Sequence, residues 1–401
     1  MSGAELRVHD DALRANTAWF AERTGGRLMA VLKADAFGHG AVARSVVEAG
    51  ATSIGVTSVA EALAVRASTP DVPVLSWLNP VDADFETAVR AEIDLAVPST
   101  EILDAVSRAA ARAGRTARVH LHVDLGMSRD GAAPDSWAAL CTAATLLERH
   151  GTVRVVGVMG HMSCADRPDD PQNARERLLF SNAVRTARRR GLRGFTTHLA
   201  ATAATITGVG DGHDLHRIGA GLFGIDPSST SDVLVPTLSL TAPVVVTRMV
   251  RAGAGIGYGH DHVVDRATNL ALLPLGYADG LPRAASERAE VQVRGRRRRV
   301  VGRFSMDMIV VDTGDDRLHP GETVTVFGRG AEGEPTVADW ARWAGTIEHE
   351  IVTGIGPRVT RTHCGAEPGH APAADTRETD SDGDTDTATA TATDRQEPAR
   401  A

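Results

Sequence analysis

Short apolar runs alternate with amphipathic stretches along the first half of the chain. The apolar runs predict strands at Leu28–Leu32, Ser53–Thr57, Val74–Trp77, Asp94–Val97, Arg118–Val123, Val153–Met159, Phe195–His198 and Leu215–Ile218. Helices are predicted between most of them, for example at Ala41–Glu48, Ala60–Arg66, Glu101–Arg112 and Arg175–Arg189. Eight strand–helix units in about 220 residues are typical of a (β/α)8 barrel. An open doubly wound sheet is the alternative, but its glycine-rich loop after the first strand is not matched by KADAFGHG.

The pattern changes after Asp226 and Pro227, where strand-like segments separated by turns replace the strand–helix rhythm. Strands are predicted at Leu238–Val250, Thr268–Pro274, Ala289–Val293, Met308–Val311 and Glu322–Phe327, which favours a mostly antiparallel β domain. A short helix is expected at Thr336–Ala344, with Thr336 as its N-cap. We therefore expect a barrel domain at residues 1–227, a β domain at residues 228–365 and a tail at residues 366–401.

The tail carries most of the net charge of −8. From Glu367 onward there are nine acidic residues and three arginines, a net of −6, so the rest of the chain has a net charge of only −2. This balance argues against a nucleic-acid partner. The tail is rich in Thr, Asp and Ala and has almost no large apolar side chains, so we expect it to be disordered. The basic run Arg296–Arg299 is interpreted as a solvated hairpin beside Gly295.

Composition points to a protein of the reducing cytoplasm. Its three cysteines, Cys141, Cys164 and Cys364, are too few for a disulfide framework. The first residues lack the charged-then-apolar pattern of a signal peptide, and no apolar stretch is long enough to span a bilayer, so no membrane contact is expected.

Lys33 is the only lysine of the chain, whereas the other basic residues are arginines. A lysine amine can lose its proton, attack a carbonyl and act as a base, which arginine cannot do. Tyrosine is also rare, with only Tyr258 and Tyr277. These counts make Lys33 and the two tyrosines the first candidates for catalytic residues.

Polar residues gather where the predicted barrel strands end, which is the face that builds the active site of a barrel. They are Lys33, Arg129, His161, His198, Thr202 and Arg217. An amine beside guanidinium groups suits a ligand that carries carboxylate or phosphate. No carboxylate pair or metal-binding spacing accompanies them, and His260 and His262 are interpreted as loop histidines, so we expect no metal.

The segment AVLKADAFGHG, which contains Lys33, resembles the pyridoxal-phosphate lysine motif of the alanine racemases. Other matching segments follow in the family's order: LHVDLGMSR, GVMGHMS, HLAATAA, HRIGAGLFGI, GIGYGHDH, LPLGYADGL, VGRFSMDMIVVD and EIVTGIGPRVTR. The resemblance covers roughly residues 6–361. It implies an N-terminal barrel, a C-terminal β domain and a head-to-tail homodimer with shared active sites.

The resemblance also implies the catalytic residues of an amino-acid racemase. Lys33 would bind the aldehyde of pyridoxal 5'-phosphate, and Tyr258 would reach the same site from the partner subunit. Two bases on opposite faces of the substrate are needed because a single base returns the proton to the face it left. Tyrosine is a poor base near its ordinary pKa of about 10, so His161 and the nearby arginines are expected to tune it.

Further binding residues follow from the same resemblance. Arg217 would face the pyridine nitrogen and disfavour its protonation, which limits side reactions such as transamination. Arg129 and the backbone of Met306 from the partner would bind the substrate. The implied cofactor-binding residues are Lys33, Phe37, His161, Thr202, Arg217, Gly219, Ala220 and His349.

Several positions depart from the family pattern, which marks a divergent member. Phe37 and His349 replace tyrosines near the phosphate, and the second of these tyrosines narrows the substrate entrance. Ala201 and Thr202 stand where Asn and Ser are common, and His122 replaces a lysine that many members carry as a carbamate. Ser305 replaces a cysteine. These changes keep the reacting groups and alter their lining, so the expected substrate is alanine or an amino acid that is bulkier or more polar.

Three alternatives remain open from the sequence. The chain could catalyse another reaction on the same fold, such as decarboxylation. It could be a cofactor carrier without turnover, although the tyrosine-bearing segment GIGYGHDH argues against this. It could also be an inactive paralogue.

Overall fold

The computed structural model describes residues 3–365, and the predicted disordered tail at 366–401 lies outside these residues. Eight parallel strands form a closed barrel in which each strand pairs with the next and the last pairs with the first. They are β2 (Leu28–Val31), β3 (Ser53–Val56), β4 (Val74–Ser76), β5 (Ile93–Val97), β6 (Ala117–His122), β7 (Val153–Met159), β8 (Thr196–Ala201) and β9 (Leu215–Ile218). The predicted barrel is confirmed, and the open sheet is wrong.

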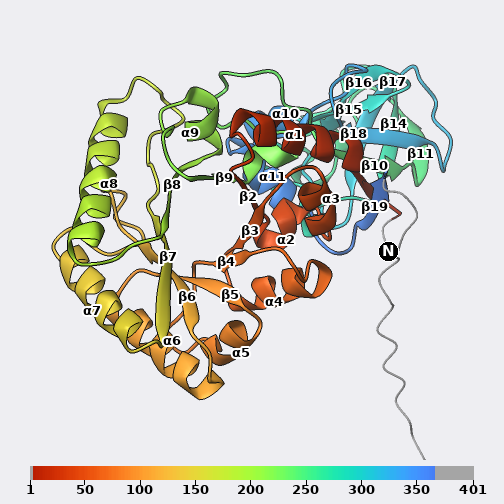
Figure 1. Cartoon of the computed structure of the whole chain (residues 1–401). Helices are drawn as coiled ribbons and strands as arrows, with labels where there is room; N and C mark the ends of the chain where they lie inside the picture. Colours follow the sequence, from red (N-terminus) through yellow and green to blue (C-terminus); the bar gives the residue numbers. More distant parts are fainter. Residues whose placement is uncertain (1–2, 366–401) are drawn as a thin grey trace, which may run out of the picture. The chain divides into compact units, whose positions relative to one another are not determined.

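Helices cover the barrel strands from outside, as Figure 1 shows for α4 to α8. They are α1 (Asp10–Arg23), α2 (Lys33–Gly38), α3 (Ala43–Glu48), α4 (Val59–Ser68), α5 (Phe85–Arg90), α6 (Thr100–Ala113), α7 (Trp137–Arg149), α8 (Pro171–Arg189), α9 (Thr202–Thr207) and the 3-10 turn η1 (Ala220–Phe223). In α6 the Ser99 hydroxyl accepts the N–H of Ile102 at the start, and Gly114 ends the helix with φ 65°. Residues between these caps bury one face at three- and four-residue spacing, as the pattern predicts.

Two predicted boundaries are wrong for identifiable reasons. Helix α8 begins at Pro171 and not at Arg175, because Asp170 caps it through the N–H of Gln172 and proline suits the first turn. The seventh barrel strand does not end at His198, since β8 continues to Ala201. His198 is therefore fully buried inside the barrel, and the prediction that it lies on the rim is wrong.

The β domain is built on a nine-stranded sheet in the order β11-β14-β17-β16-β15-β18-β10-β1-β19. Its strands are β1 (Glu5–His9), β10 (Leu238–Pro243), β11 (Val246–Val250), β14 (Thr268–Leu273), β15 (Glu290–Val293), β16 (Arg296–Val301), β17 (Ile309–Gly314), β18 (Thr323–Phe327) and β19 (Thr360–Cys364). All neighbouring pairs are antiparallel except β1 with β19. Strand β1 was not predicted, and it pairs with this sheet although it precedes the barrel in the chain.

The predicted strand Leu238–Val250 is two strands, because the chain changes partners in its middle. Strand β10 pairs with β18, whereas β11 pairs with β14. At the change, Val244 N–H donates to Glu322 O and Val245 N–H donates to Leu272 O. A continuous apolar pattern does not reveal such a change of partner.

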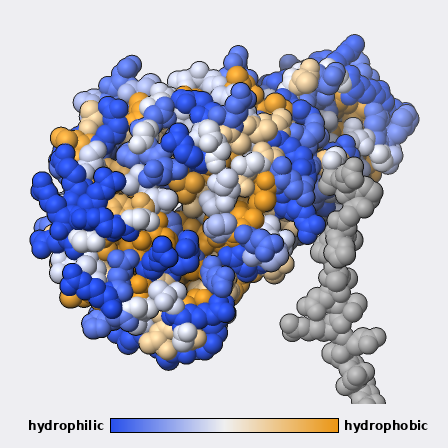
Figure 2. Space-filling view, viewed as in Figure 1, coloured by the Kyte–Doolittle hydropathy of each residue, from blue (hydrophilic) through white to orange (hydrophobic). Residues whose placement is uncertain are grey.

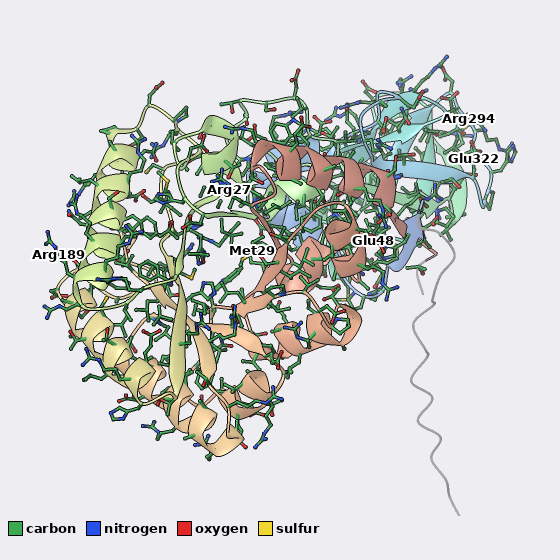
Figure 3. The ribbon with its side chains drawn as sticks, viewed as in Figure 1. Arg27, Met29, Glu48, Arg189, Arg294 and Glu322 are labelled. Atoms are coloured by element: carbon green, nitrogen blue, oxygen red, sulfur yellow. The ribbon has the colours of Figure 1, made fainter. Side chains whose placement is uncertain are left out.

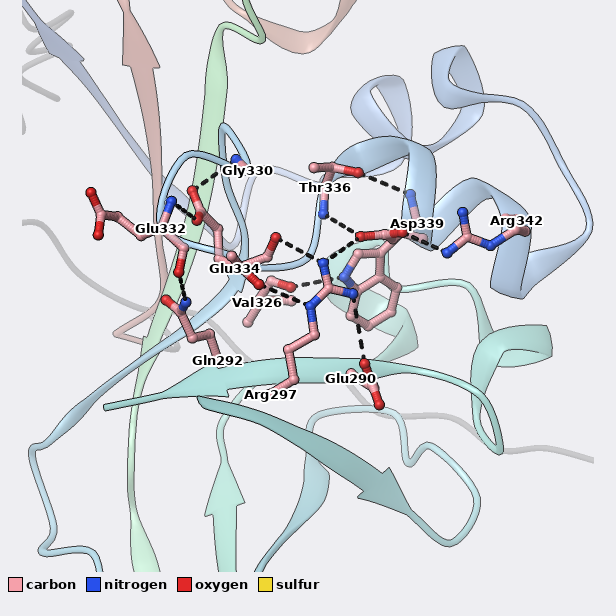
Figure 4. Close-up of polar contacts among 12 residues, drawn as sticks. Glu290, Gln292, Arg297, Val326, Gly330, Glu332, Glu334, Thr336, Asp339 and Arg342 are labelled. Carbon is pink, nitrogen blue, oxygen red and sulfur yellow. Dashed lines mark hydrogen bonds and ion pairs between the residues drawn. The ribbon is translucent and has the colours of Figure 1, made fainter. Parts of the chain in front are cut away.

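The remaining described elements of this domain are short. They are β12 (Gly255–Ile256), β13 (His262–Val263), the 3-10 turns η2 (Tyr258–His260), η3 (Tyr277–Asp279) and η4 (Arg283–Ala285), and the helices α10 (Val337–Ala344) and α11 (Glu348–Gly354). Thr336 caps α10 as predicted: its hydroxyl accepts the Asp339 N–H, and the Asp339 carboxylate accepts the Thr336 N–H (Figure 4).

The basic run Arg296–Arg299 lies on the β15–β16 hairpin, as predicted. Arg297 donates to the Asp339 carboxylate at 3.0 Å and thus fixes the hairpin to the start of α10 (Figure 4). At the turn, Arg294 forms an ion pair with Glu322, and Figure 3 shows the two side chains together. Carboxylates therefore neutralise part of this run.

Inward-facing side chains fill the barrel at every second residue of each strand. Met29 (labelled in Figure 3), Leu75, Ala96 and Met159 form a small apolar cluster there. The larger core lies between the strands and the surrounding elements. None of the helices within residues 3–365 combines the length and apolar character needed to cross a bilayer.

Candidate active site at the C-terminal end of the barrel

A cavity of about 650 Å³ opens at the C-terminal ends of the barrel strands. On the face of the molecule drawn in Figure 2, apolar side chains gather in patches among mostly hydrophilic neighbours. Of the residues predicted for the site, the cavity is lined by Lys33, Phe37, Arg129, His161, Thr202, Arg217, Gly219, Ala220 and His349. The fold thus brings together residues from the first and last barrel strands and from α11 of the β domain.

Lys33 starts a left-handed turn. The four residues that follow it, Ala34 to Phe37, have φ between 51° and 55°, a region that non-glycine residues rarely adopt. Each such residue costs roughly 1–2 kcal/mol, and residues under this strain tend to cluster at functional sites. The turn brings the Lys33 amine to 5.9 Å from the centre of the Phe37 ring and into the cavity.

Contacts from three directions hold this turn. Glu61 of α4 accepts the Ala34 N–H at 2.8 Å. His39 bonds the carbonyl of Phe37 at 2.9 Å and the Thr237 hydroxyl at 2.7 Å. From the other side, Arg361 donates to the carbonyl of Gly38 at 2.9 Å. Together these hydrogen bonds offset the cost of the unusual backbone.

Glu61 can be replaced by a side chain of nearly the same shape. Glu61→Gln is expected to lower the free energy of unfolding by about 1–3 kcal/mol. Its two carboxylate oxygens accept four hydrogen bonds, from Ala34 N–H, Thr57 N–H, Thr57 Oγ1 and Ser58 N–H. The NH2 group of a glutamine would face some of these N–H and O–H groups, which would then lose their acceptor. Urea unfolding at neutral pH measures the loss, with Glu101→Gln as the control on an exposed first turn of α6.

The contribution of Glu61 to the free energy of unfolding depends on pH. Burial raises the pKa of Glu61, but hydrogen bonds from Thr57, Ala34 and Ser58 outweigh it and hold the pKa below 4.5. The stabilisation is therefore present above pH 4.5 and disappears as the pH falls through the lower folded-state pKa. A difference in the free energy of unfolding between wild type and E61Q that stayed constant into strong acid would contradict this account.

Electrostatics at the site favours a neutral Lys33 amine. Burial, and then the positive charge of Arg129, lower the pKa of Lys33, while Glu61 acts weakly in the other direction. Burial and the Lys33 charge also lower the pKa of His349. An amine with a lowered pKa is a better nucleophile toward an aldehyde at neutral pH.

Thr202 and two glycines form a small polar cradle beside Lys33. The Thr202 hydroxyl accepts the N–H groups of Gly219 and Gly221, each at 3.3 Å. A side chain at Gly219 would meet the Phe37 ring at 3.0 Å, and one at Gly221 would meet the Phe20 ring at 2.4 Å. Both positions therefore have room only for glycine beside the Phe37 and Phe20 rings. Thr202, Gly219 and Ala220 line the cavity at this point, where a hydroxyl and backbone groups could meet a phosphate.

Arg217 is almost completely buried and is held by backbone carbonyls. Its two terminal nitrogens donate to the carbonyls of Gly160, His198 and Leu199 at 2.6, 2.8 and 3.3 Å. They also approach the Nδ1 atoms of His198 at 3.1 Å and His161 at 3.3 Å. Within residues 3–365, no hydrogen bond uses its Nε–H group, which remains for a ligand that accepts a hydrogen bond in the cavity.

His161 lies against Arg217 as an acceptor. Because guanidinium always donates, His161 Nδ1 must accept, and the proton of the neutral ring is then on Nε2. Burial, then Arg217 and Arg129, lower the pKa of His161 to about 3. Burial lowers the pKa of Arg217 to about 10. The pair thus consists of a neutral imidazole and a guanidinium cation at neutral pH.

Arg129 lines the cavity beside a pair of ionisable side chains. His122 Nδ1 lies 3.3 Å from Asp130 Oδ2 but makes no hydrogen bond within the described residues. Burial raises the pKa of Asp130, but His122 and Arg129 outweigh it and lower the pKa overall. Carboxylate, imidazole and guanidinium therefore lie close together at this side.

Two predicted residues do not lie in the cavity of this chain. Tyr258 is 68% exposed on η2, and Met306 is 53% exposed in the β domain. Neither belongs to the cavity lining.

Sequence reasoning missed several polar residues that support the site. Glu61 has a readable signal, since Ser58 and Glu61 have the spacing of a capping box. Asp94 and His120 are less obvious. Their signal is the period-two pattern of Arg118, His120 and His122, which turns polar side chains into the barrel.

Comparisons with known proteins agree with this geometry. The family model for the alanine racemase N-terminal domain matches residues 8–227, and that for the alanine racemase C-terminal domain matches residues 237–363. The alanine racemase of Thermobifida fusca is 44% identical over 91% of this chain and 99% of its own length.

Solved structures show the same fold. The alanine racemase from a D-cycloserine-producing Streptomyces lavendulae has a TM-score of 0.89 at 38% identity, over 92% of this chain and 98% of that chain. The Bartonella henselae alanine racemase, solved with covalently bound pyridoxal phosphate, has a TM-score of 0.82 at 24% identity. It covers 91% of this chain and 100% of that chain, and at this identity it supports the fold alone.

Proposed function

This chain belongs to the alanine racemase family, and from that premise we propose that Lys33 and Tyr258 are its two catalytic residues. The protein is a pyridoxal 5'-phosphate-dependent amino-acid racemase. Racemisation inverts Cα, so a proton must leave one face and another must arrive on the opposite face. A lysine amine and a tyrosine phenol from different subunits would supply the two faces.

The residues of the cavity fit the cofactor at its aldehyde and at its phosphate. Lys33, the only lysine, would hold the aldehyde, and its lowered pKa favours this reaction. Thr202, Gly219 and Ala220 would hold the phosphate, with Phe37 and His349 beside them. Withdrawal of electrons from the Cα–H bond of the amino acid is the chemistry that the bound cofactor supplies.

Arg217 and His161 would control the electronic state of the site. A free Nε–H of Arg217 would donate to the pyridine nitrogen, which then remains without its own proton. His161 has its proton on Nε2, so it would donate to the phenol oxygen of Tyr258 and stabilise the phenolate. Arg129 would bind the substrate, and the backbone of the partner's Met306 would bind the substrate carboxylate.

We propose a homodimer with shared active sites, and the exposed positions of Tyr258 and Met306 support it. Besides these two, Met249, Val263 and Met308 of the β domain are exposed apolar residues. A second copy that docked this surface onto the barrel would bury them and complete each cavity. In this proposal residues 1–227 bind the cofactor, and residues 228–365 supply Tyr258 and Met306 to the partner.

We further propose a cytoplasmic enzyme that acts on a small molecule, without nucleic-acid or membrane partners. The free thiols of Cys141, Cys164 and Cys364 are consistent with a reducing compartment. The charge balance outside the tail is close to neutral, with a net of −2, which suits neither partner.

Alanine is the proposed substrate, and kcat/KM for L-alanine is expected to exceed that for L-serine by about tenfold or more. A pocket built for a methyl group discriminates against a larger or more polar side chain by about 1–3 kcal/mol. Chiral chromatography of a panel of L-amino acids, including branched and basic ones, measures the ratio. His349→Tyr restores the residue usual in the family and serves as the matched comparison. Faster turnover of serine or of a larger amino acid would show that the altered lining has changed the substrate.

A further inference from the structure

A chain of hydrogen-bonded polar side chains crosses the interior of the barrel. It begins at Arg118, whose Nε and Nη2 atoms donate to the two carboxylate oxygens of Asp94 at 2.6 and 3.0 Å. His120 Nε2 lies 3.2 Å from Asp94 Oδ2. His120 Nδ1 lies 2.8 Å from His198 Nε2, and His198 Nδ1 lies 3.1 Å from Arg217 Nη1.

The chain connects two cavities at opposite ends of the barrel. Asp94 and Arg118 line a second cavity of about 670 Å³, formed around the N-terminal ends of β4, β5 and β6. Arg217 lines the active-site cavity. His120 and His198 lie between them with 4% and 0% exposure, so both rings are shielded from bulk solvent.

The two ends of the chain fix the direction of every hydrogen bond. A carboxylate only accepts, so His120 must donate from Nε2 to Asp94. A guanidinium only donates, so His198 must accept at Nδ1 from Arg217. The hydrogen bond between the imidazoles is then satisfied in one way, with His198 Nε2–H donating to His120 Nδ1. Each ring carries one proton, on Nε2.

We propose that Asp94 and His120 are positioning residues for Arg217, acting through the tautomer of His198. With the proton of His198 held on Nε2, its Nδ1 is a permanent acceptor for Arg217, whose guanidinium then keeps a fixed orientation. The proposal rests on the function proposed above, in which Arg217 faces the pyridine nitrogen. A His198 ring with its proton on Nδ1 would instead direct a donor at Arg217 and displace it.

The packing around His120 is built for this arrangement. Gly157 of β7 lies beside His120 in the register of the barrel, and a Cβ atom there would come within 1.9 Å of His120 Nδ1. Only glycine leaves room for the ring at this position. Burial lowers the pKa of His198 well below its ordinary value, which keeps the ring neutral. Burial raises the pKa of Asp94, but hydrogen bonds from His120 and Arg118 outweigh it and keep the carboxylate ionised.

Neutron diffraction from crystals of the holoenzyme in heavy water tests the proton positions directly. We expect deuterons on Nε2 of both His120 and His198 and none on either Nδ1. A deuteron on Nδ1 of His198 would overturn the proposal. This measurement does not depend on turnover, so it distinguishes a failure of the proposed hydrogen-bond chain from a failure of the proposed racemase activity.

The kinetics of His120 and Gly157 variants test whether the hydrogen-bonded side chains orient Arg217. His120→Leu removes the acceptor of His198 Nε2–H, and we expect kcat for racemisation to fall about tenfold. Because a displaced Arg217 no longer keeps the pyridine nitrogen unprotonated, α-keto acid formed per racemisation event should rise several-fold. Gly157→Ala, which displaces the His120 ring and leaves its chemistry intact, should change the same ratio in the same direction.

His216→Gln is the matched control. His216 is a buried histidine next to Arg217 on β9, and its ring bonds the Thr205 hydroxyl. Within residues 3–365, its ring makes no hydrogen bond to Asp94, His120, His198 or Arg217. Its loss should affect thermal stability without changing the ratio of keto acid to racemised product. If H120L and H216Q lowered kcat alike and left that ratio unchanged, His120 would have only a structural role and the proposal would be wrong.

Discussion

Tyr258→Phe is expected to lower kcat for racemisation by about 10²- to 10⁴-fold, the usual contribution of a positioned acid or base. The phenylalanine ring keeps the shape of the side chain but has no proton to give or take, so only one face of the substrate retains a base. Cofactor binding should persist, because Lys33, Thr202 and Gly219, which are proposed to hold the cofactor, are unchanged. Tyr277, the only other tyrosine, gives the matched control, and Tyr277→Phe should lower kcat far less.

Mixed dimers test whether Tyr258 acts on the partner. When Lys33→Ala and Tyr258→Phe subunits are combined, a shared site leaves one cavity of each mixed dimer with both native residues. Random pairing of equal amounts makes about half of the dimers mixed, so activity should return to about a quarter of wild type. This follows from the proposed exchange of residues between subunits. If activity did not return although mixed dimers formed, both residues would belong to one chain and the shared-site proposal would fail.

Lys33→Ala is expected to lower racemase activity by at least about 10⁴-fold, because the amine both holds the cofactor and serves as one of the bases. The chain has a single lysine, so borohydride reduction followed by peptide mapping should place the pyridoxyl group on one peptide only. In K33A the label and the visible absorbance should both be lost. Lys33→Arg keeps the positive charge and serves as the control.

Label on any other peptide of the wild-type protein would contradict the assignment of Lys33. A purified wild-type protein that takes up no cofactor would also contradict it. Loss of label in K33A with a normal thermal unfolding profile would separate the chemical role of the amine from a role in folding.

The barrel is predictable from the sequence because its strands are short, mostly apolar and regularly spaced, and buried parallel strands need no alternation to be recognised. The residues at the rim are predictable for the same reason, since each lies near or beyond the C-terminal end of a strand. Lys33, Arg129, His161 and Arg217 therefore lie in one cavity as expected.

Features that depend on distant contacts are not predictable in this way. Strand β1 precedes the barrel in the chain but needs β10 and β19 as partners, which lie more than 200 residues away. The end of β8 is also not predictable, because Ala200 and Ala201 have no strand preference, and the strand nevertheless continues through them and places His198 in the interior of the barrel.

The left-handed turn after Lys33 illustrates the same limit. Its residues, Ala34 to Phe37, have no glycine or asparagine that would announce positive φ. The conformation is imposed by Glu61, His39 and Arg361, which belong to separate segments. Tertiary contacts therefore override local preference at the residue that matters most for chemistry.

Strand β1 also determines the order in which the newly made protein can be completed. The ribosome releases β1 first, yet the two strands between which it lies emerge only after the whole barrel and, for β19, nearly all of the β domain. At roughly 5–20 residues per second, this segment waits for tens of seconds without its neighbours. The sheet around β1 can thus be completed only after Thr360–Cys364 has been made, and a nascent chain stalled before residue 360 leaves one edge of β1 open to cellular chaperones.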